Sequence, residues 1–472
     1  MSKNKKIRFV TFALAKYGGI ISHIEAKYKA FKDLGHDVDI IVLDYIKDIP
    51  KNQFTNKLEK LESGKFQESL DIKSQNGGYS KSEVTGYWSN PYYGWLLPDT
   101  NRIPCLNPNS VDKFKEAVKD VDLIIWSFVP TKTSEAKGFN WWHKYFELPK
   151  KTRQILSVHD GYYDLRNSWS NLLKNKIELL ECVHITSLNA CDVFDIPRTL
   201  SLDSRYVSEK NFDNITYPKD REFDFVAAHI FKSMKRMEDL VAAVPYVDSE
   251  SILVAGSGIE LYYMMTDNEE KQKPKYTVSL KTDPDASNSD IGKSLWKRAE
   301  ENGMTYLGII ENETVNDLLL NSKFAIDPSF CTHYAKYVNT HLNGFIIEAI
   351  VNGCYPILRN YRKDRVENDF IFQRLNAIYI PYDATPKEFG KYLNEALKMS
   401  EDKYLEGVYN NMELAMEILN PKSNMKKLLK TVFKGKTDDV LKGKSNDKIK
   451  SDAEKIMFDF FKYEKLPDWM ID

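Results

Sequence analysis

The sequence predicts an α/β protein built from two Rossmann-like, doubly wound domains that face a central cleft. Three observations lead to this prediction: a strand–glycine turn–helix–strand unit near the start, a second series of strands alternating with helices, and a polar linker between the two. Parallel strands need such intervening helices, because a hairpin turn joins only antiparallel strands. The 472 residues leave about 200 residues for each domain.

The first half opens with a complete β–α–β unit. Residues 7–12 are mostly β-branched or aromatic and predict a strand, Gly18-Gly19 predicts a turn, and residues 20–34 have helical spacing. Residues 38–43 form the next apolar run, so the two strands should lie parallel and side by side. Further strands of this domain are expected at 121–126, 152–158 and 183–186.

The second half repeats the alternation after a polar stretch that reads as a linker. Its strands are expected at 223–228, 252–256, 305–308, 324–326 and 355–358. We therefore place the first domain at 1–205 and the second at 222–445. Residues 46–105 are polar and then rich in turns and aromatic side chains, which indicates an insert in the first domain. Residues 446–472 end in a helical pattern that we expect to cross back to the first domain.

Composition excludes several classes of protein. The chain is 42% hydrophobic and 29% charged, which argues against both a disordered chain and a polytopic membrane protein. No apolar run reaches the roughly 18 residues of a membrane-spanning helix. Five cysteines without a C-x-x-C pair predict a reducing, cytoplasmic location and no structural metal. Lys plus Arg total 67 against 68 for Asp plus Glu, whereas nucleic-acid-binding proteins usually carry a basic excess.

Ligands of open α/β sheets bind beyond the carboxyl ends of the strands. In the first domain this place holds Gly18 and Gly19, whose lack of a side chain lets the backbone approach a ligand. It also holds His159 and Asp160, which follow a predicted strand and form a candidate catalytic pair. Plainer interpretations stay open: a tight turn at the glycines, and a loop-capping Asp beside a packed His.

The second domain has a cationic loop at the corresponding place. Lys232, Lys235 and Arg236 come between a strand and the start of a helix, where the helix dipole disfavours positive charge. A phosphate bound there would offset this cost, because the helix N–H groups and the cations would bind it together. The alternative is a solvated cluster of charges.

A third constellation runs from Thr340 to Ile357. Asn343 and Gly344 form a turn that leads into a helix carrying Glu348. A carboxylate near a helix start can accept hydrogen bonds from both hydroxyl groups of a ribose. The alternative is that Glu348 is a surface residue that binds no ligand.

The segment from Gly344 through Glu348 to Gly353 and Pro356 resembles the donor half of GT-B glycosyltransferases, together with Thr305-Tyr306-Leu307-Gly308 and Asp327-Pro328-Ser329. Gly18-Gly19 and residues 31–42 resemble the amino half of the same family. The resemblance implies two Rossmann-like domains, with a sugar-nucleotide donor held mainly by the second and an acceptor held mainly by the first. Retaining members carry two glutamates eight positions apart. Glu348 matches the second of them, but Thr340 stands at the first, which puts one sugar contact in doubt.

Two shorter stretches, 123–136 and 158–169, are similar to the DNA α-glucosyltransferases of T-even-type bacteriophages. Those enzymes move glucose from UDP-glucose to hydroxymethylcytosine in duplex DNA, with retention of configuration. The resemblance implies that the cationic loop neutralises the leaving diphosphate without a metal. It also implies that His159 and Asp160 orient the acceptor; in an inverting enzyme Asp160 would be the general base.

An enzyme that modifies a base in duplex DNA extrudes that base from the stack. The aromatic insert offers stacking side chains, and we consider Tyr87, Trp88 and Trp95, with Arg166 of the second similar stretch, as acceptor-binding residues. Local packing of a long loop is the alternative interpretation of the aromatics.

Four functions remain open at this point. The first is a phage DNA glucosyltransferase in the host cytoplasm, working with double-stranded DNA as a monomer or weak dimer. The second is a GT-B enzyme for a cell-surface glycan or small-molecule acceptor. The third is a non-catalytic protein that binds a sugar nucleotide or DNA, and the fourth is a sugar-nucleotide epimerase with the same two-domain layout.

Overall fold

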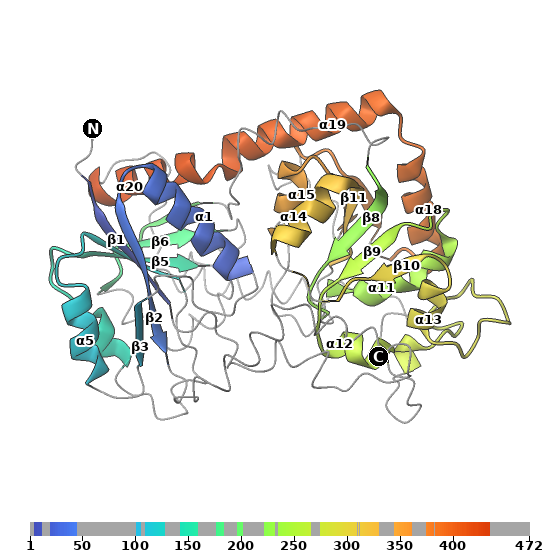
Figure 1. The fold of residues 1–472 in the computed structure, drawn as a ribbon, viewed down its shortest axis with the longest axis horizontal. Coiled ribbons are helices and arrows are strands. Elements are labelled where there is room, and N and C mark those ends of the chain that lie inside the picture. Colours follow the sequence, from blue (N-terminus) through green and yellow to red (C-terminus); the bar gives the residue numbers. More distant parts are fainter. Residues whose placement is uncertain are drawn as a thin grey trace, which may run out of the picture. The chain divides into compact units, whose positions relative to one another are not determined.

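The computed structural model describes residues 4–11, 19–44, 101–104, 109–127, 142–158, 176–183, 196–201, 221–231, 235–265, 274–308, 310, 312–329, 344–360, 374–381 and 383–434. They form two compact units, each built around one sheet (Figure 1). The first unit takes its described residues from the stretches 1–50, 91–207 and 417–463, and the second takes them from 208–416.

The first unit contains a parallel sheet with the strand order β3-β2-β1-β4-β5-β6-β7. Its strands are β1 (Lys6–Thr11), β2 (Asp37–Asp44), β3 (Asn101–Pro104), β4 (Leu123–Trp126), β5 (Arg153–Val158), β6 (Leu179–Cys182) and β7 (Arg198–Leu200). Its described helices are α1 (Gly19–Asp33), α5 (Ser110–Ala117), the 3-10 turn η2 (Trp142–Phe146) and α20 (Pro421–Lys434). The predicted β–α–β unit at the start is confirmed by β1, α1 and β2.

Side chains alternate between the two faces of this sheet. Phe9 and Ile155 belong to a core that α1 and α20 complete, with Leu428 among the residues that α20 contributes. Figure 1 shows α20 lying beside α1. The opposite face carries Trp126, which stacks on Phe146 of η2 at a centroid distance of 4.1 Å. Burial on both faces explains why most of these strands read as continuous apolar runs.

The first unit differs from the predictions in several places. A strand that was not predicted lies at Leu179–Cys182, where the buried Glu181 breaks the apolar pattern. Of the strand expected at 183–186, Val183 lies just beyond β6, and 184–186 lie outside the described residues. The expected insert gives its last residues to β3, which pairs with β2. Helix α20 belongs to the first unit rather than to the second domain expected at 222–445. The segment 446–472, expected to cross back, lies outside the described residues.

The second unit contains a parallel sheet with the order β10-β9-β8-β11-β12-β13. Its strands are β8 (Phe223–Ala228), β9 (Ile252–Ala255), β10 (Met304–Tyr306), β11 (Ser322–Asp327), β12 (Tyr355–Asn360) and β13 (Ile378–Pro381). Its helices are α11 (Met237–Ala243), α12 (Ile259–Met265), α13 (Leu295–Glu300), α14 (Asn312–Asn321), α15 (Gly344–Val351), α18 (Pro386–Leu397) and α19 (Glu401–Leu414). Short helical turns follow at η6 (Val244–Tyr246), η7 (Pro274–Tyr276) and η8 (Ala415–Leu419). The last residues of η8 already belong to the first unit.

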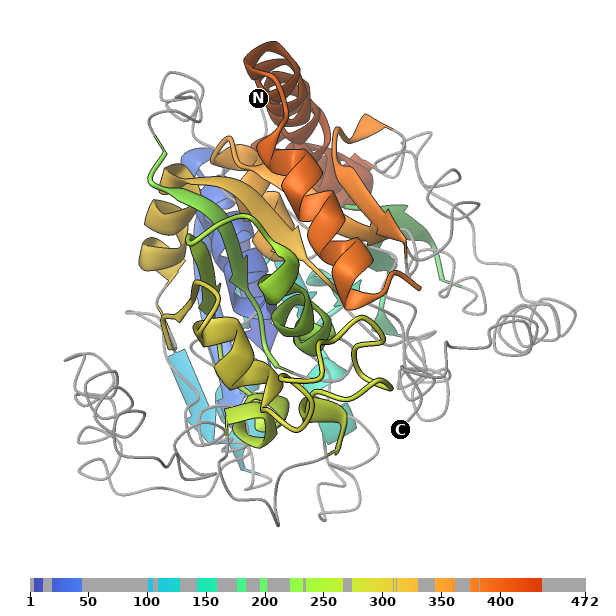
Figure 2. The same ribbon diagram turned by 90° about the vertical axis from the view of Figure 1, so that its right-hand side faces the viewer.

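Helices cover both faces of this second sheet (Figures 1 and 2). Leu240 of α11, Trp296 of α13 and Leu393 of α18 share one core with the strands. Helix α14 contacts β8 and β11, and α15 contacts β11 and β12; Figure 1 shows both helices on the other side of the sheet. The predicted doubly wound arrangement is therefore confirmed in both units.

Candidate functional site

The candidate site lies at the carboxyl ends of β8 and β11. These neighbouring strands mark the point where the strand order of the second sheet reverses, and open α/β sheets bind ligands in the crevice at such a point. His229 follows β8 directly, and Asp327 is the last residue of β11. The two side chains meet there, with Nε2 of His229 3.8 Å from Oδ1 of Asp327.

The His229 ring is buried and held from two sides. Nε2 lies 3.0 Å from the carbonyl oxygen of Ile326, and the ring meets Phe345 of α15 edge-on with centroids 5.0 Å apart. Burial lowers the pKa of His229, and the nearby Asp327 does not fully offset this effect. The ring is therefore neutral near pH 7. Nε2 donates its hydrogen to the carbonyl group, which leaves Nδ1 as an acceptor.

Asp327 is held as an anion at this point. Burial by itself would raise its pKa, but the ammonium of Lys235 and the hydrogen bonds from Ser329 oppose burial, and the pKa is lowered. The Ser329 N–H donates to Oδ1 at 3.0 Å. Lys235 therefore lies within electrostatic reach of the switch point. Among the described residues its ammonium makes no close salt bridge, and its charge acts on Asp327 through space.

Arg236, by contrast, is held by acidic residues of α11. It caps that helix in the left-handed conformation, with φ 47°. Its guanidinium donates two hydrogen bonds to Asp239, at 3.0 and 2.8 Å, and lies 3.3 Å from Glu238. Asp239 also accepts a hydrogen bond from Arg359 of β12. Arg236 is thus less available to a phosphate than Lys235 is, although their positions in the sequence predict the same role for both.

The two acidic residues change the charge at the start of α11. Glu238 and Asp239 lie in its first turn, where negative charge complements the helix dipole. Burial raises the pKa of Glu238 to about 7, with Arg236 acting in the opposite direction. The interpretation of the loop as purely cationic is therefore incomplete, because these buried acids offset part of its charge.

A glycine-containing loop after β9 packs closely against the backbone of the His229 segment. Gly256 and Gly258 flank Ser257 directly after β9, with φ values of 128° and 153°. A Cβ at Gly256 would lie 1.8 Å from the carbonyl oxygen of His229, so no other residue fits there without a shift. The Phe231 N–H donates to the Ser257 carbonyl at 2.8 Å. The Gly-Ser-Gly sequence directly after β9 is the signal in the sequence for this contact, and the prediction of a strand at 252–256 does not include the contact.

Helix α15 begins at Gly344, as expected. Glu348 is half-buried, whereas its neighbours Ile347 and Ala349 are fully buried. The carboxylate-bearing side of α15 is therefore its more exposed side. The helix starts after β11 and its Phe345 contacts His229, so Lys235, Asp327 and α15 all lie around the same switch point.

In the first unit Gly19 is the first residue of α1. The other predicted site residues lie outside the described residues: Gly18, Tyr87, Trp88, Trp95, His159, Asp160, Arg166, Lys232 and Asn343. Their roles remain predictions.

Metal-binding clusters and membrane-spanning helices are both absent from the described part of the chain. No group of three or more His, Cys, Asp or Glu side chains in it can hold a metal ion. None of the described helices is long and apolar enough to cross a membrane.

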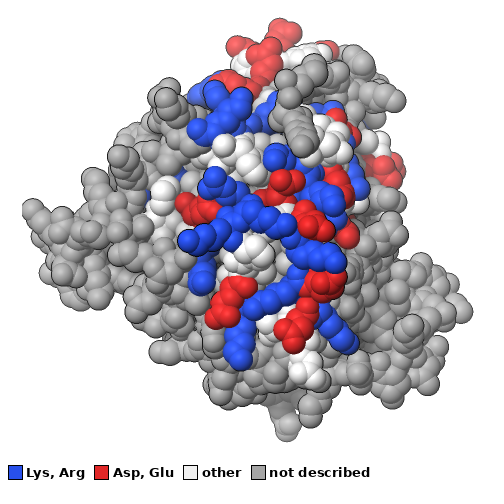
Figure 3. Space-filling view, turned by 90° about the vertical axis from the view of Figure 1, so that its left-hand side faces the viewer, with Lys and Arg blue, Asp and Glu red and all other residues white. Residues whose placement is uncertain are grey.

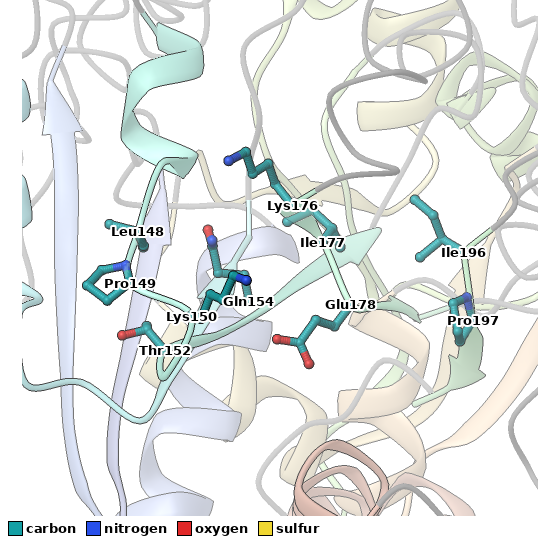
Figure 4. A pocket seen from close by; sticks show the side chains of 10 residues that line it. All are labelled: Leu148, Pro149, Lys150, Thr152, Gln154, Lys176, Ile177, Glu178, Ile196 and Pro197. Atoms are coloured by element: carbon teal, nitrogen blue, oxygen red, sulfur yellow. The ribbon is translucent and has the colours of Figure 1, made fainter.

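The described part of the first unit has a hollow of about 630 Å³. It lies at the amino ends of β5, β6 and β7, opposite to the edge where ligands of such sheets bind. Figure 4 shows its lining: Leu148, Pro149, Lys150, Thr152, Gln154, Lys176, Ile177, Glu178, Ile196 and Pro197. None of these was predicted as a site residue, and we do not assign the donor or acceptor to this hollow.

The two sheets and their order define the chain as a protein with the GT-B glycosyltransferase fold. Alr3699/HepE from Anabaena, solved with UDP-glucose, shares 11% identity at a TM-score of 0.52, over 90% of this chain and 99% of that one. An α-glucosyltransferase solved with UDP-glucose and DNA containing an abasic site shares 10% identity at a TM-score of 0.57, over 92% and 100%.

A mutant of TarM from S. aureus, solved with Fondaparinux, α-GlcNAc-glycerol and UDP, shares 13% identity at a TM-score of 0.52, over 91% and 100%. No family model and no curated protein sequence matches the chain. At such low identity these likenesses establish the fold, and the molecules bound to the three proteins differ.

Proposed function

We propose that the protein is a UDP-sugar-dependent glycosyltransferase that moves glucose from UDP-glucose to a hydroxymethylated base of duplex DNA, with retention of configuration. One observation carries the donor half of the proposal. A cation beside Asp327, Lys235, and a half-exposed carboxylate on α15, Glu348, belong to segments around one switch point. A nucleoside diphosphate needs both, since it presents anionic phosphates and a ribose diol.

Lys235 would stabilise the charge that develops on the diphosphate as the anomeric C–O bond breaks. A fixed cation beside a buried network changes little during the reaction, which is what makes electrostatic stabilisation effective. We assign Lys232 the same role from the sequence. Glu348 would accept hydrogen bonds from the ribose hydroxyls, and the turn at Asn343 and Gly344 would admit the nucleotide. The cations make a metal ion unnecessary for this step.

His159 and Asp160 would act on the acceptor side. In a retaining reaction the leaving phosphate oxygen takes the proton of the acceptor hydroxyl on the face where that hydroxyl attacks. The protein then has to orient the acceptor and stabilise positive charge on the sugar. A histidine followed by a carboxylate, directly after β5, provides groups for both tasks.

The DNA acceptor rests on two supports. The stretches 123–136 and 158–169 are similar to phage DNA glucosyltransferases, and an α-glucosyltransferase solved with DNA shares the fold over 92% of this chain. Surface charge does not add to these. On the face in Figure 3, Lys and Arg side chains are interspersed with Asp and Glu. Some basic side chains of the first unit are paired with acidic ones, as in Lys5–Asp122 and Arg8–Asp37.

The test compares two matched duplexes that differ only in one base, hydroxymethylcytosine or cytosine. Each is incubated with the protein and isotope-labelled UDP-glucose, and the nucleosides are analysed by mass spectrometry. We expect labelled glucose on the hydroxymethylated base alone. Absence of glucose from both duplexes, with UDP-glucose still hydrolysed, would refute the DNA acceptor. Absence of both hydrolysis and transfer would refute the enzyme.

A glycan acceptor is the second candidate, favoured by the mixed surface charge and by TarM, which was solved with Fondaparinux. Salt separates the two. DNA affinity falls steeply with ionic strength because counterions are released on binding, whereas binding of a neutral glycan does not. A salt-independent affinity for duplex DNA would therefore favour the glycan.

A further inference from the structure

The core of the first unit contains a fully buried ion pair. Lys27 of α1 and Glu181 of β6 both have side chains with 0% exposure, and Nζ lies 2.5 Å from Oε1. The same ammonium lies 3.3 Å from Oγ of Ser157 on β5. One cation therefore connects a helix to two neighbouring strands.

This pair lies beside the apolar core that α1 covers, among further buried polar residues that include His23, Thr199 and Ser201. Ile155 and Leu179, two residues before Ser157 and Glu181 on their strands, belong to the core that α1 covers. Ser157 and Glu181 are opposite each other in the β5–β6 register. Burial by itself would raise the pKa of Glu181, but Lys27 and the buried His23 outweigh it and lower that pKa. The carboxylate is thus ionised in the core.

Such a pair adds little net stability. Removing two charges from water is costly for each ion, and well-packed apolar residues often replace a buried pair without loss. The same face shows that apolar packing was available, because Ile155 and Leu179 already pack against α1. The charges therefore need a reason other than stability.

The location of the pair provides one. Ser157 is the second-last residue of β5, and the chain continues through Val158 directly into His159 and Asp160. Lys27 lies two turns into α1, whose first residue follows the predicted ligand turn at Gly18. The ammonium thus ties the helix behind one predicted ligand segment to the strand that precedes the other.

We propose that Lys27 is a positioning residue for the acceptor reaction, an inference that rests on the proposed function. It contacts no substrate. Its directional bonds to Glu181 and Ser157 fix the depth of α1 against β5, which apolar contacts alone fix less sharply because they have no preferred direction.

The test uses Lys27→Met, Glu181→Met and the double variant, in which two apolar side chains replace the pair. Lys29→Met is the matched control, since Lys29 is an exposed lysine of the same helix. We expect Lys27→Met to lower both the melting temperature and kcat for transfer to hydroxymethylated DNA. The double variant should recover the melting temperature but keep a kcat about 10-fold to 100-fold below that of the wild type. KM for UDP-glucose should stay unchanged in all four.

A purely structural role predicts something else: kcat would return together with the melting temperature in the double variant. That result would overturn the proposal. Hydrogen exchange of peptides covering 156–162 provides a readout without turnover. Faster exchange in the double variant than in Lys29→Met is expected, and equal exchange would also overturn it. If the wild type modifies no DNA, the proposed function fails, while the exchange comparison still decides the role of Lys27.

Discussion

Arg236 and Asp239 form a two-pronged ion pair across the first turn of α11, and Arg359 approaches the same carboxylate from β12. One acidic side chain thus holds two arginines from different parts of the second unit. The two residues of the cationic loop therefore have divided roles. Arg236 stabilises the start of α11, and Lys235 is left to bind the ligand.

This division predicts opposite effects for two neighbouring alanine variants. Lys235→Ala should lower kcat/KM for UDP-glucose about 100-fold without changing the melting temperature. Arg236→Ala should destabilise the fold by about 1–3 kcal/mol, since Asp239 loses charged hydrogen bonds but keeps Arg359. Thermal unfolding and steady-state kinetics on both variants check this. A stable Arg236→Ala protein that binds UDP-glucose poorly would contradict it.

The raised pKa of Glu238, about 7, predicts a pH-dependent stability. The folded state keeps a proton that the unfolded chain releases above its ordinary pKa of 4.5. Stability from this group is therefore full below that value and is lost as the pH rises through 7. We expect Glu238→Gln to gain in melting temperature over the wild type as the pH is raised from 5 to 8. Glu250→Gln, at an exposed position, serves as the control, and parallel curves for wild type and Glu238→Gln would disprove the assignment.

Because the Glu348 carboxylate on α15 is half-exposed, we expect its removal to weaken donor binding and to leave the fold unchanged. Glu348→Ala should weaken UDP binding about 10-fold to 100-fold, since hydrogen bonds to a charged acceptor contribute about 1.5–3 kcal/mol. Titration calorimetry with UDP measures the change, and the melting temperature should stay the same. Glu395→Ala on exposed α18 surface should bind UDP normally. Unaltered affinity in Glu348→Ala would remove this residue from the donor site.

The loop after β9 predicts a contrast between two glycines. Gly256→Ala should destabilise the protein strongly, because its Cβ would lie 1.8 Å from the His229 carbonyl oxygen. Gly292 also has a positive φ, of 89°, but nothing within 4 Å of its Cβ position, so Gly292→Ala should cost only about 1 kcal/mol. Denaturant unfolding of both variants measures the difference. Equal losses would mean that backbone strain alone, without the clash, sets the cost.

Much of the fold was predictable because local patterns encode it. The strands β1, β2, β8 and β9 are short apolar runs ended by turns or glycines, and period and punctuation are enough to locate them. The same rule failed at β6, where Glu181 interrupts the run. A lone charge argues against burial in any sequence, and the residue that makes burial possible, Lys27, is 154 positions away.

The candidate site was predictable only in part, for a related reason. Position at a strand end selected Lys235 and Glu348 as residues around the switch point. The same criterion also predicted a ligand-binding role for Arg236, because a sequence does not show which acidic side chain pairs with which basic one. His229 and the glycine loop at Gly256 were missed, since their meaning depends on strands β8, β9 and β11 lying side by side.

Helix α20 has a consequence for how the protein is made. Met425, Leu428 and Val432 complete the apolar core of the first unit, yet they are translated only after the whole described part of the second unit. During synthesis, α20 therefore cannot cover its face of the first sheet until roughly half of the chain has been added after that sheet. A nascent chain that ends before Pro421 therefore lacks the side chains with which α20 completes this core, and we expect it to expose apolar surface.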